Sequence, residues 1–84
     1  MPNHDPVAQF LVAFGHAVRE RREALGLSQE ELSFRSELDR TYISGIERGV
    51  RNATLKTLLR VSQALEVRPD KLLAAAQAFL EPRR

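Results

Sequence analysis

Two short helices joined by only three residues are the feature that most limits how this chain can fold. Residues 28–31 (Ser-Gln-Glu-Glu) form a capping box, which predicts a helix that continues to about residue 36. Asp39 is a favourable cap for a second helix, which should run through Arg48. The link at residues 37–39 is too tight for an antiparallel hairpin of long helices. The spacing therefore predicts two crossed helices, the geometry of a helix-turn-helix.

Apolar spacing and end signals predict three further helices. The first begins at Asp5-Pro6, ends before Gly26 and contains a Gly15 that indicates close packing. Its apolar positions recur at helical steps, at Val7, Leu11, Phe14, Val18 and Leu25. The fourth helix is predicted from Thr54 to Leu65, and the fifth begins with Pro69 in its first turn and continues to about Leu80. No segment alternates with period two, so we expect an all-α fold of five helices.

Length and composition exclude several classes of protein. The chain has 84 residues, enough for one domain (1–84) and not for two. It has no Cys, which excludes disulfide scaffolds, thiolate catalysis and zinc fingers. It has no apolar run long enough for a membrane span and no signal peptide, so we expect a cytoplasmic protein. It also lacks a phosphate-binding glycine loop and a catalytic motif, so we expect no enzyme activity and no cofactor. His16 has no partner at metal-ligand spacing, so we expect no metal site.

Charge is unevenly distributed although the net charge is only +2. Residues 28–39 carry four acidic side chains and one Arg, whereas residues 40–60 carry five basic side chains and one Glu. At 100° per residue, Ile43 and Ile46 of the third helix face inward, with Glu47 beside them. The opposite stripe is polar, cationic and free of acids, and consists of Arg40, Thr41, Ser44, Gly45 and Arg48. Arg, Thr and Ser are side chains that read base edges in DNA, and Gly45 should leave a gap for close approach.

Residues 29–48 resemble the helix-turn-helix of lambda-repressor-like regulators (Cro/CI, xenobiotic-response-element type). The resemblance extends to residues 22–29 and 65–70 and covers about two thirds of the chain. Residues 38–48 (LDRTYISGIER), followed by Arg51-Asn52, resemble more closely the controller proteins of restriction–modification systems.

The resemblance implies a role for each matching residue. Gln29 would contact a phosphate, and Arg22 and Glu47 would form an ion pair between the first and third helices. The residues placed against base edges would be Arg40, Thr41, Ser44 and Gly45. Those that hold the DNA backbone would be Tyr42, Arg48, Arg51 and Asn52.

The chain departs from the family pattern at three positions. Ser33 stands where Ala is usual, and Arg68 stands where a Ser or Thr cap is expected. Glu37 occupies a turn position that favours Gly; if its φ is positive, the strain is about 1 kcal/mol. None of the three lies on the face assigned to base reading.

These observations predict a sequence-specific transcriptional regulator that binds a near-palindromic DNA operator as a homodimer, with RNA polymerase as a further partner. Dimerisation is expected through residues 54–80, whose apolar side chains exceed what one small core can absorb; the interface residues would be Leu55, Leu59, Leu73 and Phe79. The alternative at the assembly level is that the fifth helix folds back onto Phe10, Leu11 and Phe14. The alternative function is an antitoxin or adaptor that uses the same fold for a protein partner.

Overall fold

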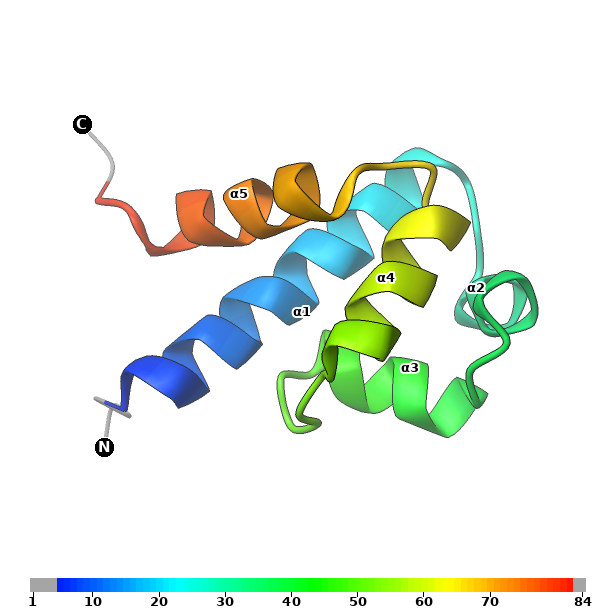
Figure 1. The fold of residues 1–84 in the computed structure, drawn as a ribbon, viewed down its shortest axis with the longest axis horizontal. Coiled ribbons are helices and arrows are strands. Elements are labelled where there is room, and N and C mark those ends of the chain that lie inside the picture. Colours follow the sequence, from blue (N-terminus) through cyan, green and yellow to red (C-terminus); the bar gives the residue numbers. More distant parts are fainter. Residues whose placement is uncertain (1–4, 83–84) are drawn as a thin grey trace.

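The computed structural model describes residues 5–82, and this part of the chain forms five helices and no strand. The helices are α1 (Pro6–Ala24), α2 (Gln29–Ser36), α3 (Arg40–Glu47), α4 (Leu55–Ala64) and α5 (Pro69–Leu80) (Figure 1). The predicted all-α fold and the order of its elements are confirmed. None of the described helices is both long enough and apolar enough to cross a membrane.

The long helix α1 packs against two other helices, α3 and α5 (Figure 1). Helix α5 packs mainly along α1, and α3 packs against α1 and α2. Helix α4 connects the two halves, because it contacts both α2 and α5. The α2–α3 pair therefore stands at the end of the molecule away from the chain termini (Figure 1).

Local capping explains where the helices begin. Asp5 accepts the N–H of Val7 at 3.0 Å, and Asp39 accepts the N–H of Thr41 at 3.1 Å. Both hydrogen bonds of the predicted capping box are present, since Ser28 and Glu31 bond to each other's backbone N–H. Helix α5 has no side-chain cap, as expected from Arg68 in that position.

The core forms where the inner faces of all five helices meet. Its most buried large side chains are Val18, Leu32, Ile43, Ile46, Val61, Leu65 and Leu72. Val7, the first position of the apolar period of this helix, does not reach the core, because it is 65% exposed. The first turn of α1 extends beyond the ends of α3 and α4 (Figure 1).

Gly15 allows α1 to approach the end of α3 closely, as the sequence indicated. A Cβ at this position would clash with the Ile46 carbonyl oxygen and lie 2.6 Å from that of Glu47. Any larger residue would push the backbones of the two helices apart. The position of α3 on the body of the molecule therefore depends on this contact.

Candidate nucleic-acid interface

The turn between α2 and α3 is fixed by one residue in a left-handed conformation. Glu37 has φ 59° and ψ 30°, which is the positive φ that the glycine-favouring position predicted. Its backbone N–H donates to the Ser33 carbonyl, and the Ser33 hydroxyl donates to the Leu38 carbonyl. Ser33 thus closes the turn with its side chain, a bond that Ala at this position cannot make.

The inner face of α3 packs against the core. Ile43 and Ile46 are fully buried, and they pack with Leu32 of α2 and the half-buried Leu38 of the turn. Contact on both sides of the turn fixes the crossing of the two helices. The opposite side of α3 is left to face outward.

Arg22 and Glu47 form the predicted ion pair between α1 and α3. Nε and Nη2 of Arg22 donate to the two Glu47 carboxylate oxygens at 2.7 and 2.9 Å, a bidentate arrangement. The Arg22 side chain is 11% exposed and that of Glu47 only 3%. The hydrogen bond to Glu47 raises the pKa of Arg22 above its ordinary value, and the remaining Nη1 donates to the Leu27 carbonyl at 2.7 Å.

Gln29 also takes part in the hydrogen-bond network of Arg22 and Glu47. Its side-chain amide donates to Oε1 of Glu47 at 3.1 Å, and the residue is half-buried. The resemblance implied that Gln29 contacts a phosphate. In this structure its amide completes the hydrogen bonding of Glu47, at the N-terminus of α2, and the phosphate contact stays a prediction.

The outer stripe of α3 is Arg40, Thr41, Ser44, Gly45 and Arg48. Arg40, Thr41 and Arg48 are exposed, and Ser44 is half-buried. The stripe carries two guanidinium groups and no carboxylate. Side chains of this kind on an exposed helix supply charge for phosphates and hydrogen bonds for base edges.

Gly45 does not leave the open gap expected from the sequence. It is buried, because the side chain of Arg51 lies across it: a Cβ on Gly45 would clash with Cγ of Arg51 and lie 3.3 Å from its Nε. The loop after α3 folds back onto the helix and brings this Arg to the outer stripe. The prediction used the angle of 100° per residue within the helix alone. It could not include the path of the loop, which brings Arg51 onto Gly45.

The loop after α3 is held to the helix by Tyr42. Its hydroxyl donates to the Asn52 carbonyl at 3.0 Å and lies 3.3 Å from the Thr57 hydroxyl of α4. The Val50 N–H also donates to the Gly45 carbonyl at 3.0 Å. Tyr42 and Asn52 therefore position the segment that carries Arg51.

Comparison with known proteins agrees with this geometry. The sequence profile of the helix-turn-helix family matches residues 18–72. Control protein C.BamHI of Bacillus amyloliquefaciens is 49% identical over 61 residues, which cover 71% of this chain and 75% of that protein. The chain belongs to the helix-turn-helix family.

Solved structures of helix-turn-helix proteins are similar as well. The restriction–modification controller protein C.AhdI from Aeromonas hydrophila superposes with a TM-score of 0.73 at 52% identity, over 74% of this chain and 94% of that chain. The clp gene regulator ClgR of Corynebacterium glutamicum superposes with a TM-score of 0.82 at 27% identity, over 88% of this chain and 96% of that chain. The resemblance to controller proteins is thereby confirmed.

One contributor to this helix-turn-helix interface was missed by sequence reasoning. Thr57 is buried in α4 beside the Tyr42 hydroxyl and the Thr54 hydroxyl. The sequence predicted Thr54 as a helix cap. No local pattern links Thr57 to Tyr42, which lies 15 positions earlier in the sequence. Among residues 5–82, no group of three or more His, Asp and Glu side chains is placed to hold a metal ion.

The four residues expected at a dimer interface all lie at the surface of α4 and α5. Leu55 is 83% exposed, and Leu59, Leu73 and Phe79 are partly exposed. Phe79 also stacks on His16 of α1, with ring centroids 5.3 Å apart. Helix α5 thus packs along α1, as the fold-back alternative requires, but large apolar side chains remain uncovered.

Proposed function

We propose that this helix-turn-helix protein is a sequence-specific, DNA-binding transcriptional regulator that acts as a homodimer, in the manner of restriction–modification controller proteins. The observation that carries the proposal is the outer stripe of α3, which carries the exposed Arg40, Thr41 and Arg48 and no acidic side chain. The inner face of the same helix is buried, and its last residue is held by the Arg22–Glu47 pair. A helix fixed in this way can present its outer side chains to the major groove of DNA without first reorganising.

Residue roles follow from position along the stripe. Arg40, Thr41 and Ser44 are assigned to base edges, together with Gly45, across which the Arg51 side chain lies. Tyr42 and Asn52 are assigned to the DNA backbone through the loop that they fix, Arg48 to the backbone directly, and Gln29 to a phosphate at the start of α2. Arg51 is assigned to the backbone from the family pattern, although its contact with Gly45 brings it beside the base-reading residues.

A homodimer on a near-palindromic operator supplies the discrimination that one copy lacks. A single recognition helix reads only a few base pairs, which is too little against the competing sites of a genome. Two copies related by a two-fold axis present their helices about 34 Å apart, one turn of DNA. Binding beside a promoter then blocks RNA polymerase or recruits it, and these events occur in the cytoplasm.

The test compares Arg40→Ala with Arg48→Ala on the cognate operator and on random duplex. Arg40→Ala is expected to weaken cognate binding by about 1–3 kcal/mol and relax preference at one base position. Arg48→Ala is expected to weaken all sequences similarly and to flatten the dependence of log Kd on log salt. Arg51→Ala, measured in parallel, assigns this side chain to one group or the other.

The division between base and backbone contacts is wrong if Arg40→Ala and Arg48→Ala reduce cognate and random binding equally. DNA affinity that does not fall with salt favours the alternative, an antitoxin or adaptor with a protein partner.

A further inference from the structure

A chain of three side-chain hydroxyls runs from α4 to the loop after α3. The Tyr42 hydroxyl must be the donor to the Asn52 carbonyl, because a carbonyl oxygen only accepts. Its single proton is then used, so at the 3.3 Å contact with Thr57 the Thr57 hydroxyl is the donor. The Thr57 hydroxyl in turn accepts from the Thr54 hydroxyl at 3.1 Å. Every proton therefore points the same way, from the N-terminus of α4 to the Asn52 carbonyl.

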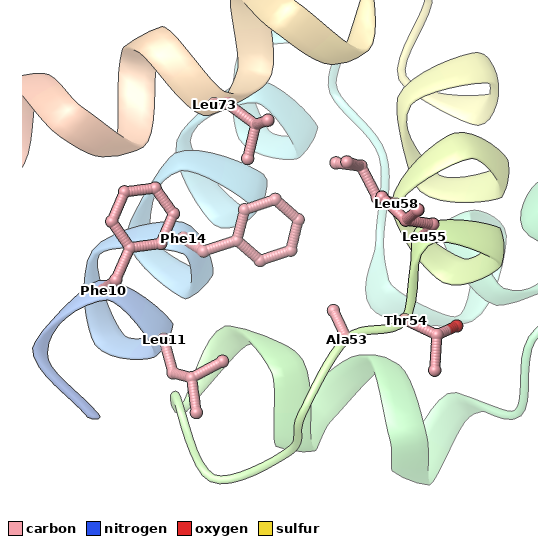
Figure 2. A pocket seen from close by; sticks show the side chains of 8 residues that line it. All are labelled: Phe10, Leu11, Phe14, Ala53, Thr54, Leu55, Leu58 and Leu73. Carbon is pink, nitrogen blue, oxygen red and sulfur yellow. The ribbon is translucent and has the colours of Figure 1, made fainter. Parts of the chain in front are cut away.

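Thr54 begins this chain where the loop after α3 enters α4, next to Ala53 (Figure 2). Its hydroxyl oxygen accepts the Thr57 N–H at 3.1 Å and so caps the helix. The chain thus starts on a backbone group of α4 and ends on a backbone group of the loop. Hydroxyls that are linked in this way polarise one another, which strengthens each bond of the chain.

Thr57 differs from the other buried residues that carry a hydroxyl. Among residues 5–82 these are Ser36 and Ser62, and each donates to the carbonyl four residues earlier in its own helix. Such a bond satisfies the hydroxyl locally and links nothing outside the helix. Thr57 is 6% exposed, and its hydroxyl reaches out of α4 to α3. This hydroxyl therefore serves a contact between elements.

The loop that the chain holds carries Arg51 onto the outer stripe of α3. On one side of Arg51, the Val50 N–H donates to the Gly45 carbonyl at 3.0 Å. On the other side, the hydroxyl chain holds the Asn52 carbonyl. The Arg51 side chain lies across Gly45 between these two anchors, and the second anchor depends on Thr57.

We propose that Thr57 is a positioning residue for DNA binding: through Tyr42, its hydroxyl orders the loop so that Arg51 meets DNA in a fixed orientation. The proposal rests on the proposed DNA-binding function, because Thr57 is buried and acts without contacting DNA itself. A loop that is already ordered loses less conformational freedom on binding. The chain thus raises DNA affinity without adding a contact.

Thr57→Val is the variant that tests the proposal, because Val has nearly the shape of Thr and lacks the hydroxyl. Without DNA, it is expected to lower the amide order parameters of residues 51–53, which report fast backbone motion. Ser62→Ala is the matched control, since it removes a buried hydroxyl of α4 whose bonds stay within that helix. The control should leave the loop as it is in the parent, and equal order parameters in the parent and Thr57→Val overturn the proposal.

With DNA, the readout is the Kd for the cognate operator. Thr57→Val is expected to weaken binding by about two- to tenfold, the effect of one hydrogen bond. Thr57→Ser keeps the hydroxyl and should bind as the parent does, and so should Ser62→Ala. Binding by Thr57→Ser that is as weak as that of Thr57→Val overturns the proposal.

A second background separates positioning from a general loss of stability. If Thr57 acts through Arg51, Thr57→Val should have little further effect on the Kd of a chain that already carries Arg51→Ala. A merely structural role weakens binding by the same factor in both backgrounds, and that result overturns the proposal. If Thr57→Val fails to fold, Thr57→Ala removes the same hydroxyl and takes its place in each comparison.

Failure of the proposed function is distinguishable from failure of Thr57 as a positioning residue. A parent that prefers no duplex overturns the proposed function and with it any role of Thr57 in DNA binding. Unchanged order parameters in Thr57→Val overturn the ordering of the loop alone, because they are measured without DNA.

Discussion

At the scale of single residues, the buried ion pair explains why two charges can lie in the core of so small a protein. Removing Arg22 and Glu47 from water is unfavourable unless each remaining hydrogen-bonding atom finds a partner. Here Leu27 and Gln29 supply the additional partners. The pair therefore fixes the end of α3 on α1 at a defined point.

Glu47→Gln should destabilise the protein far more than a change at the surface. The substitution leaves the Arg22 charge buried without its counter-ion, and breaking such a pair costs about 3–5 kcal/mol. The measurement is the free energy of unfolding by chemical denaturation. Glu30→Gln, at an exposed position of α2, is the matched control and should change it by less than about 0.5 kcal/mol. Equal values for both variants would contradict a structural role for the pair.

At the scale of elements, the sequence predicted what local chemistry determines. Helix starts at Asp5, Ser28, Asp39 and Thr54 were predictable because each cap is satisfied by a backbone N–H within three residues. The position of Arg51 over Gly45 was not predictable, because it depends on how the loop after α3 folds back across this helix. The same holds for Gln29, whose partner Glu47 lies 18 residues away. Within the interface, the helices were thus predictable, and the partners of its side chains were mostly not.

The turn between α2 and α3 is one of two places among residues 5–82 where a residue other than glycine has a positive φ. Glu37 is left-handed, a conformation that costs a residue with a side chain about 1–2 kcal/mol relative to right-handed backbone. Glu37→Gly should remove this strain and, after allowing for the greater freedom of glycine in the unfolded chain, raise the free energy of unfolding by up to about 1 kcal/mol. Denaturant midpoints at constant slope provide the measurement.

Glu30→Gly is the control for this prediction, since it makes the same substitution inside α2. It should lower the free energy of unfolding by about 1 kcal/mol, because glycine is unfavourable within a helix. Loss of stability in both variants would show that the Glu37 side chain contributes more than its backbone strain removes.

At the scale of the whole molecule, the distribution of apolar side chains indicates an assembly. Helix α5 buries Leu72 and Ala76 against the body of the protein but leaves Leu73 partly exposed. On α4, Leu55 and Leu59 remain at the surface. Fold-back of α5 onto α1 therefore accounts for part of the apolar surplus of residues 54–80, and the remainder forms a surface available to a second copy.

Leu55→Glu should separate the two copies without unfolding either. The residue is 83% exposed and occupies the first turn of α4, where a carboxylate is favourable to the helix dipole, so the monomer should retain its stability. In a two-fold interface the change places an unpaired charge on each copy within an apolar contact. Sedimentation at micromolar concentration is expected to show a dimer for the parent and a monomer for this variant, and the variant should lose its preference for a full palindrome over a half-site.

Phe34→Glu, at an exposed apolar position of α2, should leave the dimer intact. A parent that sediments as a monomer and binds half-sites as tightly as palindromes would refute assembly through α4 and α5.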